Sequence, residues 1–238
     1  MANLTQMKVL EGLDGFLLVD KPVNIPFASV VKTVKRMFGL VKVGHGGSLD
    51  AQSSGLMVLL IGDANKFTDQ TMGGDREYEG TLDTSFITNT GDSQGVKVER
   101  EGEGGQWSVD LKQFKGDVFQ TEPRFAAIRK EGTADYEIVD TGDHKQFLGH
   151  VYRLELGVGG TEEDSGGEGE KKTFRLKATK NVIPRALALD MGATLVSLRR
   201  TKQWKFDVKD AVPFEQILKT SPADFASLVL PMGVALRS

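Results

Sequence analysis

Two apolar runs near the N-terminus predict buried β-strands. Leu13 to Asp20 forms the first run, which stops before Pro22 and Pro26 because proline cannot donate a hydrogen bond to a β-ladder. Leu56 to Ile61 is a second, unbroken apolar run of buried-strand length. The glycine-rich stretch from Gly44 to Asp50 leads into this second strand, and we expect it to be a loop held between rigid elements.

The residues between these two strands predict an amphipathic helix. Apolar side chains recur at helical spacing, at Val30, Val31, Val34, Met37 and Phe38. The opposite face carries Lys32, Lys35 and Arg36. Ser29 is the expected N-cap, and Gly39 is the residue expected beyond the C-terminal end.

Later segments predict further strands. Polar and apolar residues alternate, with varying regularity, over Tyr78 to Phe86, Val151 to Val158 and Phe174 to Lys180. A further strand, rich in basic residues, is expected over Leu195 to Phe206. The second and third of these strands should pair as an antiparallel hairpin. Its tip, a charged insert from Gly159 to Lys172, is expected to be exposed and flexible.

Short helices and turns complete the pattern. We expect Asp63 to cap a short helix through Phe67, and Pro184 to lie in the first turn of a helix through Met191. An exposed hairpin or turn is expected over Gly91 to Gln106. Two terminal helices are expected, at Phe214 to Leu218 and at Ala223 to Val229. Without a regular βαβ rhythm, the order favours an α+β fold with a largely antiparallel sheet.

Composition indicates a cytoplasmic protein. The 238 residues include no cysteine, so disulfides, thiolate zinc sites and cysteine nucleophiles are excluded. The first residues lack the pattern of a secretory signal, and no apolar run approaches the roughly 18 residues that a membrane span needs. We therefore expect neither a membrane partner nor secretion.

The net charge of −3 masks a mildly basic remainder. Five acidic residues lie between Gly159 and Glu170, and the rest of the chain carries +2. Two basic runs stand out, one at Lys32, Lys35, Arg36 and Lys42 and one at Arg199, Arg200, Lys202 and Lys205. Each run could bind a phosphate backbone or could be an ordinary solvated face. Composition alone does not distinguish these two interpretations.

Several chemistries lack their motifs. The Gly44 to Asp50 loop is followed by no Gly-Lys-Ser/Thr, so it matches no Walker loop or dinucleotide fingerprint. His45, His144 and His150 form no recognised metal-ligand pair, and no nucleophile elbow of a serine hydrolase is present. Asp50 remains as the candidate, either as a turn residue or as a catalytic carboxylate.

Seven ordered motifs resemble those of the TruB-type tRNA pseudouridine-55 synthases. The central motif is Val43 to Asp50, followed by Ser54 to Leu56 and Gly62 to Lys66. The other motifs, in chain order, are Asp20-Lys21-Pro22, Asp75 to Tyr78, Thr88 to Gly95, Gln120 to Ile128 with Tyr136-Glu137, Lys180 to Arg185, and Asp190-x-Gly192 with Leu198 to Thr201.

The resemblance implies a pseudouridine-synthase fold over residues 1–238, with a mixed, mainly antiparallel sheet flanked by helices and a basic cleft. Asp50 resembles the nucleophilic aspartate, Tyr78 the aromatic residue that stacks on the target base, and Arg185 the ion-pair partner of the aspartate. The remaining expected substrate contacts are His45, which helps extrude the uridine, the small-residue loop at Gly46 and Gly47, the motif residue Lys21, and the pocket residues Ile183 and Leu198.

The implied reaction is isomerisation of a uridine in the T-arm of tRNA. The uracil never leaves, so the resemblance implies no cofactor, metal or second substrate. A base stacked inside an RNA loop must first be flipped out, at a cost of a few kcal/mol. We expect a monomer, and the small C-terminal RNA-binding PUA domain of many relatives is not expected.

Several positions depart from the family pattern. The family run Lys-Gly-Thr-Tyr-Ile-Arg reads here Lys180-Asn181-Val182-Ile183-Pro184-Arg185, so Ile183 replaces the pocket tyrosine. Ala51 stands where proline is customary, and Arg129 where lysine is usual. These changes keep an alternative open, a catalytically impaired tRNA-binding or folding protein of the same fold. A different structured RNA as substrate is a third hypothesis.

Overall fold

A computed structural model describes residues 12–99, 108–129, 136–142, 145–158 and 171–236. The chain divides into two compact units. The first unit comprises Met1–Gly74 and Arg200–Ser238, and the second comprises Asp75–Arg199. The expected single catalytic domain stays a prediction, and each unit is described by itself.

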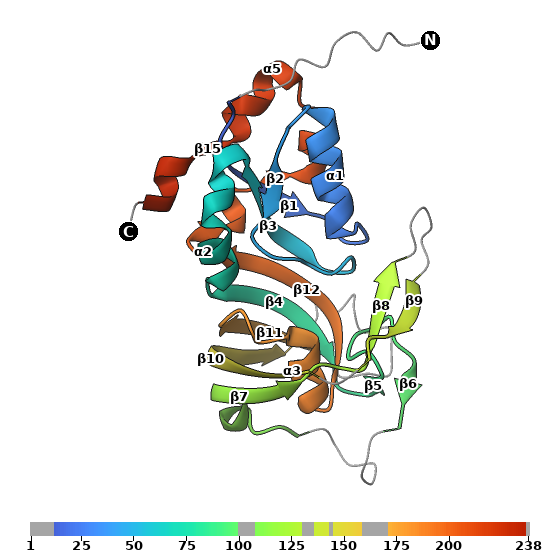
Figure 1. The fold of residues 1–238 in the computed structure, drawn as a ribbon. Helices are drawn as coiled ribbons and strands as arrows, with labels where there is room; N and C mark the ends of the chain where they lie inside the picture. The colour runs from blue at the N-terminus through green and yellow to red at the C-terminus, as the bar shows by residue number, and fades with distance from the viewer. Residues whose placement is uncertain (1–11, 100–107, 130–135, 143–144, 159–170, 237–238) are drawn as a thin grey trace. The chain divides into compact units, whose positions relative to one another are not determined.

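Strands of the first unit follow the order β14-β1-β3-β12, where β12 contributes its C-terminal residues. Figure 1 labels β1, β3 and β12 of this sheet. The long pair is β1 (Gly15–Lys21) with β3 (Ser54–Ile61), which run antiparallel. The other strands are β2 (Val43–His45), β12 (Thr194–Gln203), β13 (Phe206–Asp207), β14 (Val212–Pro213) and β15 (Leu230–Pro231). Both predicted N-terminal strands are therefore confirmed.

Both faces of the β1 and β3 pair are buried, which explains their unbroken apolar sequences. Leu17 and Val19 point to one face and pack with helix α1 (Phe27–Met37) and with α4 (Phe214–Ile217). The alternate residues Phe16 and Leu18 point to a second core. A strand covered on both sides has no solvated face that would require polar residues at alternate positions.

Helix α1 begins earlier than predicted. It starts at Phe27, directly after Pro26, whose carbonyl accepts hydrogen bonds from the backbone N–H groups of Ser29 and Val30. Ser29 therefore lies inside the first turn, and its prediction as N-cap is wrong. Gly39 follows the helix with a φ of 60°, as expected for the residue that ends it.

The predicted helix after β3 is also present, but its cap is different. A 3₁₀ helix spans Gly62–Phe67 and is followed by α2 (Thr68–Gly73). The backbone N–H of Asp63 donates to the Asp14 carboxylate at 2.6 Å, so the capping acid is Asp14 and not Asp63. Both terminal helices are found near their predicted places, at α4 and α5 (Pro222–Phe225).

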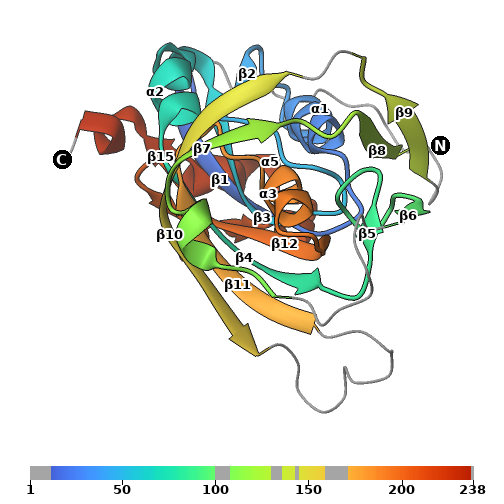
Figure 2. The ribbon, with the colours of Figure 1, turned by 90° about the horizontal axis from the view of Figure 1, so that it is seen from below.

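The second unit is a curved antiparallel sheet in the order β12-β4-β11-β10-β7 (Figure 2). Its other strands are β4 (Arg76–Asp83), β11 (Lys171–Ala178), β10 (Gln146–Val158) and β7 (Gly116–Thr121). Helix α3 (Pro184–Asp190) lies inside the curve, and its Leu187 and Ala188 pack in the same core as the strands. Two small hairpins complete the unit, β5 (Ile87–Thr88) with β6 (Lys97–Val98) and β8 (Phe125–Arg129) with β9 (Tyr136–Asp140).

The predicted hairpin of β10 and β11 is confirmed, with shifted ends. Lys171 and Lys172 belong to β11 and not to its tip, because they pair with Leu82 and Asp83 of β4. Residues 159–170, the rest of the predicted acidic insert, lie outside the described residues. The expected strand to Phe206 ends at Gln203, since Trp204 adopts a φ of 55° and turns the chain into β13.

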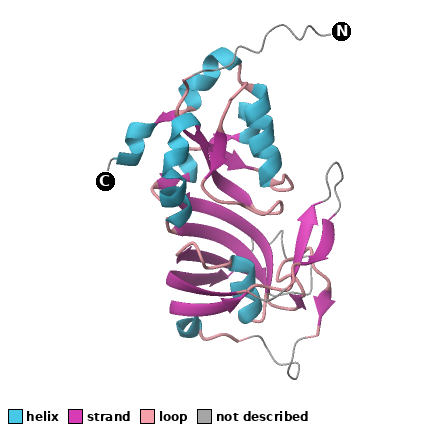
Figure 3. Cartoon of the chain, viewed as in Figure 1, coloured by secondary structure: helices cyan, strands magenta, loops and turns pink. Residues whose placement is uncertain are grey.

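Helices and strands are interspersed in both units, as Figure 3 shows, and the α+β prediction is confirmed. None of the helices in the described ranges is long and apolar enough to cross a membrane.

Gly55 provides a test of the packing in the first unit. Its φ is 102°, and a Cβ atom there would lie 2.3 Å from the carbonyl oxygen of Arg200. We expect Gly55→Ala to lower the free energy of unfolding by at least about 2 kcal/mol, measured by urea denaturation. Gly73→Ala is the control, because nothing lies within 4 Å of its added Cβ. Equal stability of the two variants would contradict the close approach.

Candidate active site

The loop that carries Asp50 belongs to the first unit. Strand β2 pairs with β3 so that His45 lies opposite Leu59, and the N–H of Gly46 donates to the carbonyl of Val58 at 2.8 Å. The predicted loop is thus shorter than expected, because residues up to His45 form a strand. Asp50 lies at the end of this loop with its side chain exposed.

Arg200 holds the loop from inside the protein. Its guanidinium donates to the carbonyls of Leu56 at 2.7 Å, Ser48 at 2.9 Å and Gly47 at 3.4 Å. The residue is only 1% exposed. A buried cation requires such partners, because its desolvation is costly. The sequence allowed Arg200 as a phosphate contact, and this burial excludes that role.

Two more buried side chains bind carbonyls of the same loop. The amide of Gln203 donates to the carbonyls of Gly46 and Thr71. The ammonium of Lys21 donates to the carbonyl of Ala51 at 3.2 Å, and also to those of Pro22 and Ile25. The residues on both sides of Asp50 are therefore anchored by carbonyl contacts.

Lys21 is fully buried, and three carbonyls receive its three N–H groups. Burial lowers the pKa of Lys21 to about 8, while the nearby charge of Asp50 raises that pKa and the charge of Arg200 lowers it further. These contacts lie within the first unit and use every donor of the ammonium, so they lend no support to a direct contact of Lys21 with RNA, which stays a prediction.

His45 is uncharged at neutral pH. Burial, and secondarily the positive charge of Arg200, lowers the pKa of the imidazole below its usual 6.5. The N–H of Gly47 donates to Nδ1 of His45 at 3.3 Å, which leaves the proton on Nε2. The edge of the imidazole also packs against the ring of Phe27, with centroids 5.0 Å apart.

The other predicted site residues belong to the second unit. Tyr78 on β4 and Leu198 on β12 pack in one core, with 6% and 7% of their surfaces exposed. Arg185, at the second position of α3, is also largely buried. Its guanidinium donates to the carbonyls of Thr90 at 3.0 Å and Phe125 at 3.2 Å.

Arg185 also has a carboxylate partner within its unit, which the sequence did not reveal. One nitrogen of its guanidinium lies 3.2 Å from a carboxylate oxygen of Glu122. The side chain of Arg185 is 11% exposed and that of Glu122 is 32% exposed, so the arginine side of this ion pair is largely shielded from solvent while the carboxylate is partly accessible. Asp50 belongs to the other unit, and its pairing with Arg185 stays a prediction.

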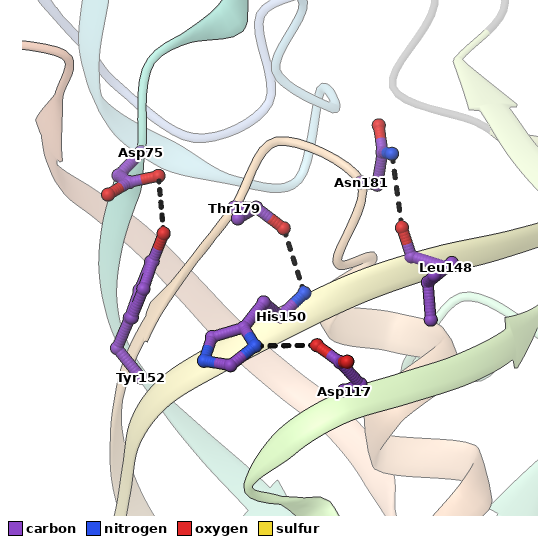
Figure 4. A network of polar contacts seen from close by, with 7 residues as sticks. All are labelled: Asp75, Asp117, Leu148, His150, Tyr152, Thr179 and Asn181. Atoms are coloured by element: carbon purple, nitrogen blue, oxygen red, sulfur yellow. Dashed lines mark hydrogen bonds and ion pairs between the residues drawn. The ribbon is translucent and has the colours of Figure 1, made fainter.

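The segment that leads to Arg185 is bound to β10 (Figure 4). Thr179 and His150 exchange two hydrogen bonds, from the N–H of His150 to the Thr179 hydroxyl and from the N–H of Thr179 to the His150 carbonyl. The amide of Asn181 donates to the carbonyl of Leu148 at 3.1 Å. The side-chain amide of Asn181 thus supports the segment at a position where the family usually has glycine.

The next two residues are fixed as well. A Cβ atom on Gly149 would lie 2.5 Å from a methyl carbon of Val182, so only glycine allows this close packing. The buried amide of Gln120 accepts from the N–H of Ile183 at 2.9 Å and donates to its carbonyl at 3.3 Å. Pro184 then begins α3, as predicted.

The structure therefore brings the predicted residues together in two groups. Asp50, His45, Gly46, Gly47 and Lys21 share the first unit, and Tyr78, Arg185, Ile183 and Leu198 share the second. Sequence reasoning gave no role to Gln120, Glu122 or Gln203, whose partners lie far away along the chain. In the described ranges, no group of three or more His, Asp or Glu side chains is arranged to hold a metal ion.

Solved structures share this fold. The chain aligns with a structure titled "Crystal Structure of a Cbf5-Nop10-Gar1 Complex" at a TM-score of 0.61 and 20% identity, covering 92% of this chain and 60% of that one. A second, titled "Structure of H/ACA RNP bound to a substrate RNA containing 2'-deoxyuridine", gives 0.58 and 20%, over 92% and 59% of the two chains. The chain shares its α+β fold with these two structures.

Sequence comparisons then identify the family. Residues 35–155 match the model of the TruB family pseudouridylate synthase N-terminal domain. The chain is 32% identical to tRNA pseudouridine synthase B of Azoarcus sp. (strain BH72), over 89% of this chain and 71% of that protein. It is 31% identical to the protein of the same name from Opitutus terrae, over 95% and 96%. The chain belongs to the TruB family of pseudouridylate synthases.

The burial of Lys21 makes a prediction about pH. Between about pH 8 and 10.5, the unfolded chain holds a proton that folded Lys21 has released. The free energy of unfolding should therefore rise over this range relative to the variant Lys21→Met. Urea denaturation at several pH values measures this difference, with Lys219→Met as an exposed control. A difference that stays constant with pH would show that Lys21 is not desolvated.

Proposed function

We propose that this protein converts a uridine of tRNA to pseudouridine, at the T-loop, with Asp50 as its essential carboxylate. The observation that carries the proposal is the loop geometry. An exposed carboxylate lies on a loop whose carbonyls are bound by the buried side chains of Arg200, Gln203 and Lys21. Such preorganisation is what a reacting group requires. The relatives named tRNA pseudouridine synthase B support tRNA as the substrate.

The reaction breaks the bond between ribose C1′ and uracil N1 and forms a bond from C1′ to C5. The C5 proton is lost, and N1 gains a proton, so the product is an isomer of the uridine. The Asp50 carboxylate either captures C1′ in an ester bond that breaks when C5 attacks, or removes a ribose proton that it returns after the bond from C1′ to C5 has formed. Both routes require its ionised form. Arg185 is proposed as the cation that favours this form.

The remaining residues serve base flipping and binding. Tyr78 is proposed to stack on the extruded uracil, which recovers part of the stacking energy lost by the RNA loop. His45, neutral and with Nε2 protonated, has one N–H to donate to the RNA near the vacated position. Leu198 and Ile183 are proposed as apolar walls of the base pocket.

Asp50→Asn tests the catalytic role directly. We expect pseudouridine formation on an unmodified tRNA transcript to fall by at least roughly 10³-fold, because the amide keeps the size but not the charge. RNA affinity should change little. Product is mapped at nucleotide resolution. A variant as active as the wild type would eliminate Asp50, whereas a wild type that binds tRNA without product would favour the non-catalytic alternative.

Gln120→Leu tests the positioning of Arg185. The apolar side chain removes both hydrogen bonds to Ile183, so the start of α3 is no longer fixed. We expect kcat to fall by about 10²-fold, as for a misplacement of about 1 Å, with KM nearly unchanged. Gln120→Glu is the companion variant: it keeps the acceptor for the Ile183 N–H, and at mildly acidic pH, where its protonated carboxyl can also replace the donor to the Ile183 carbonyl or to the Asp190 carboxyl, it should retain more activity than Gln120→Leu. Equal, wild-type kcat in both would remove Gln120 from the positioning of the site.

A further inference from the structure

We propose that one of the two basic runs, and not the other, binds the phosphate backbone of the RNA next to the target uridine. The surface is the cationic face of α1, defined here as Lys32, Lys35 and Arg36 together with Lys42, which follows the helix. This inference rests on the proposed function and adds the place where the RNA strand is held.

The cationic face is a continuous surface on one side of α1. Lys32, Lys35 and Arg36 follow the spacing i, i+3 and i+4, which places side chains next to each other on a helix. All three are exposed, while Val30 and Val34 on the opposite side are fully buried. The buried valines fix the helix orientation, so the cations must point to solvent.

Nothing in the described part of the chain neutralises these cations. No carboxylate of the described residues forms an ion pair with Lys32, Lys35, Arg36 or Lys42. The sequence from Lys21 to Leu49 contains no aspartate or glutamate. Like charges at i+3 and i+4 destabilise a helix, so this arrangement is unfavourable until a polyanion binds.

The helix dipole explains only part of the pattern. Lys35 and Arg36 lie in the last turn of α1, where positive side chains interact favourably with the carbonyl end of the helix. Lys32 lies a turn earlier, and Lys42 lies beyond the helix. A phosphate backbone accounts for all four cations, because its charges are spaced along a strand.

The second basic run is already engaged in the folded protein. Arg200 is buried among carbonyls, and the ammonium of Lys202 lies 4.0 Å from the carboxylate of Asp207. Lys205 donates to the carbonyl of Ala235 at 3.0 Å and lies over the Trp204 ring. These contacts set the second run apart from the cationic face of α1.

The cationic face is attached to the Asp50 loop at two points. Phe27, the first residue of α1, packs against the ring of His45. Lys42 directly precedes β2 and is three residue steps, about 10 Å of extended strand, from His45. An RNA strand with one nucleotide at His45 and Asp50 therefore has its neighbouring phosphates within reach of this face.

The test compares two triple variants of the full chain. The first variant carries glutamine in place of Lys32, Lys35 and Arg36. The control variant carries glutamine in place of three other exposed lysines, Lys66, Lys209 and Lys219. Both variants lose three positive charges. Binding of an unmodified tRNA transcript is measured by fluorescence anisotropy over a range of salt concentrations, after circular dichroism has shown equal folding.

The first variant should bind at least roughly tenfold more weakly, and its slope of log K against log salt should be smaller by about 2 to 3. The control should keep the wild-type slope. Equal slopes in all three proteins, or equal losses in both variants, would overturn the inference. So would binding of phosphatidylserine vesicles that depends on this face while tRNA binding does not. Failure to form pseudouridine would instead refute the proposed function, because the binding assay does not depend on catalysis.

Discussion

The buried guanidinium of Arg200 is the constraint on which the first unit depends. A cation that is almost completely removed from water must be surrounded by acceptors, and here the acceptors are backbone carbonyls of the loop before Asp50 and of β3. These hydrogen bonds restrain the conformation of the loop. Gly55 is part of the same constraint, because a side chain there would collide with the Arg200 backbone. Hydrogen-bond satisfaction inside the protein thus determines where an exposed carboxylate is presented.

In the second unit, the largely buried guanidinium of Arg185 also requires hydrogen-bond acceptors inside the protein. Its guanidinium is held by two carbonyls and by Glu122, and the preceding segment is bound residue by residue to β10, β7 and β4. A short helix of seven residues has little stability of its own, so these tertiary contacts fix its first turn. Each unit therefore carries one charged group of the proposed site, held by contacts within that unit.

The sequence predicted those elements whose patterns are local. Strands β1 and β3 were predicted because burial on both faces produces an unbroken apolar run, and α1 and α3 because of periodicity and Pro184. Contacts between distant residues left no such pattern. Asp14 caps a helix 49 residues later, and Gln120 binds Ile183 across 63 residues. The burial of Arg200 could not be predicted, because its partners are backbone carbonyls. Every residue has a carbonyl, so no sequence pattern marks the ones that bind Arg200. The motif resemblance named Asp50, whose surroundings only coordinates could supply.

The contact between Gly149 and Val182 has a consequence for how this segment can change. Asn181 and Val182 stand where the family usually has glycine and threonine, and their side chains are matched by Leu148 and Gly149 on β10. Ile183 stands at the tyrosine position and is bound to Gln120 of β7 through its backbone alone. Restoring glycine at 181 alone would remove the bond to Leu148 without restoring the pocket. Substitutions here should therefore be epistatic, with effects that do not add. The departures from the family in this segment therefore depend on one another. Exchanging the segment together with the strands that support it, β10 and β7, is more informative than reverting one position.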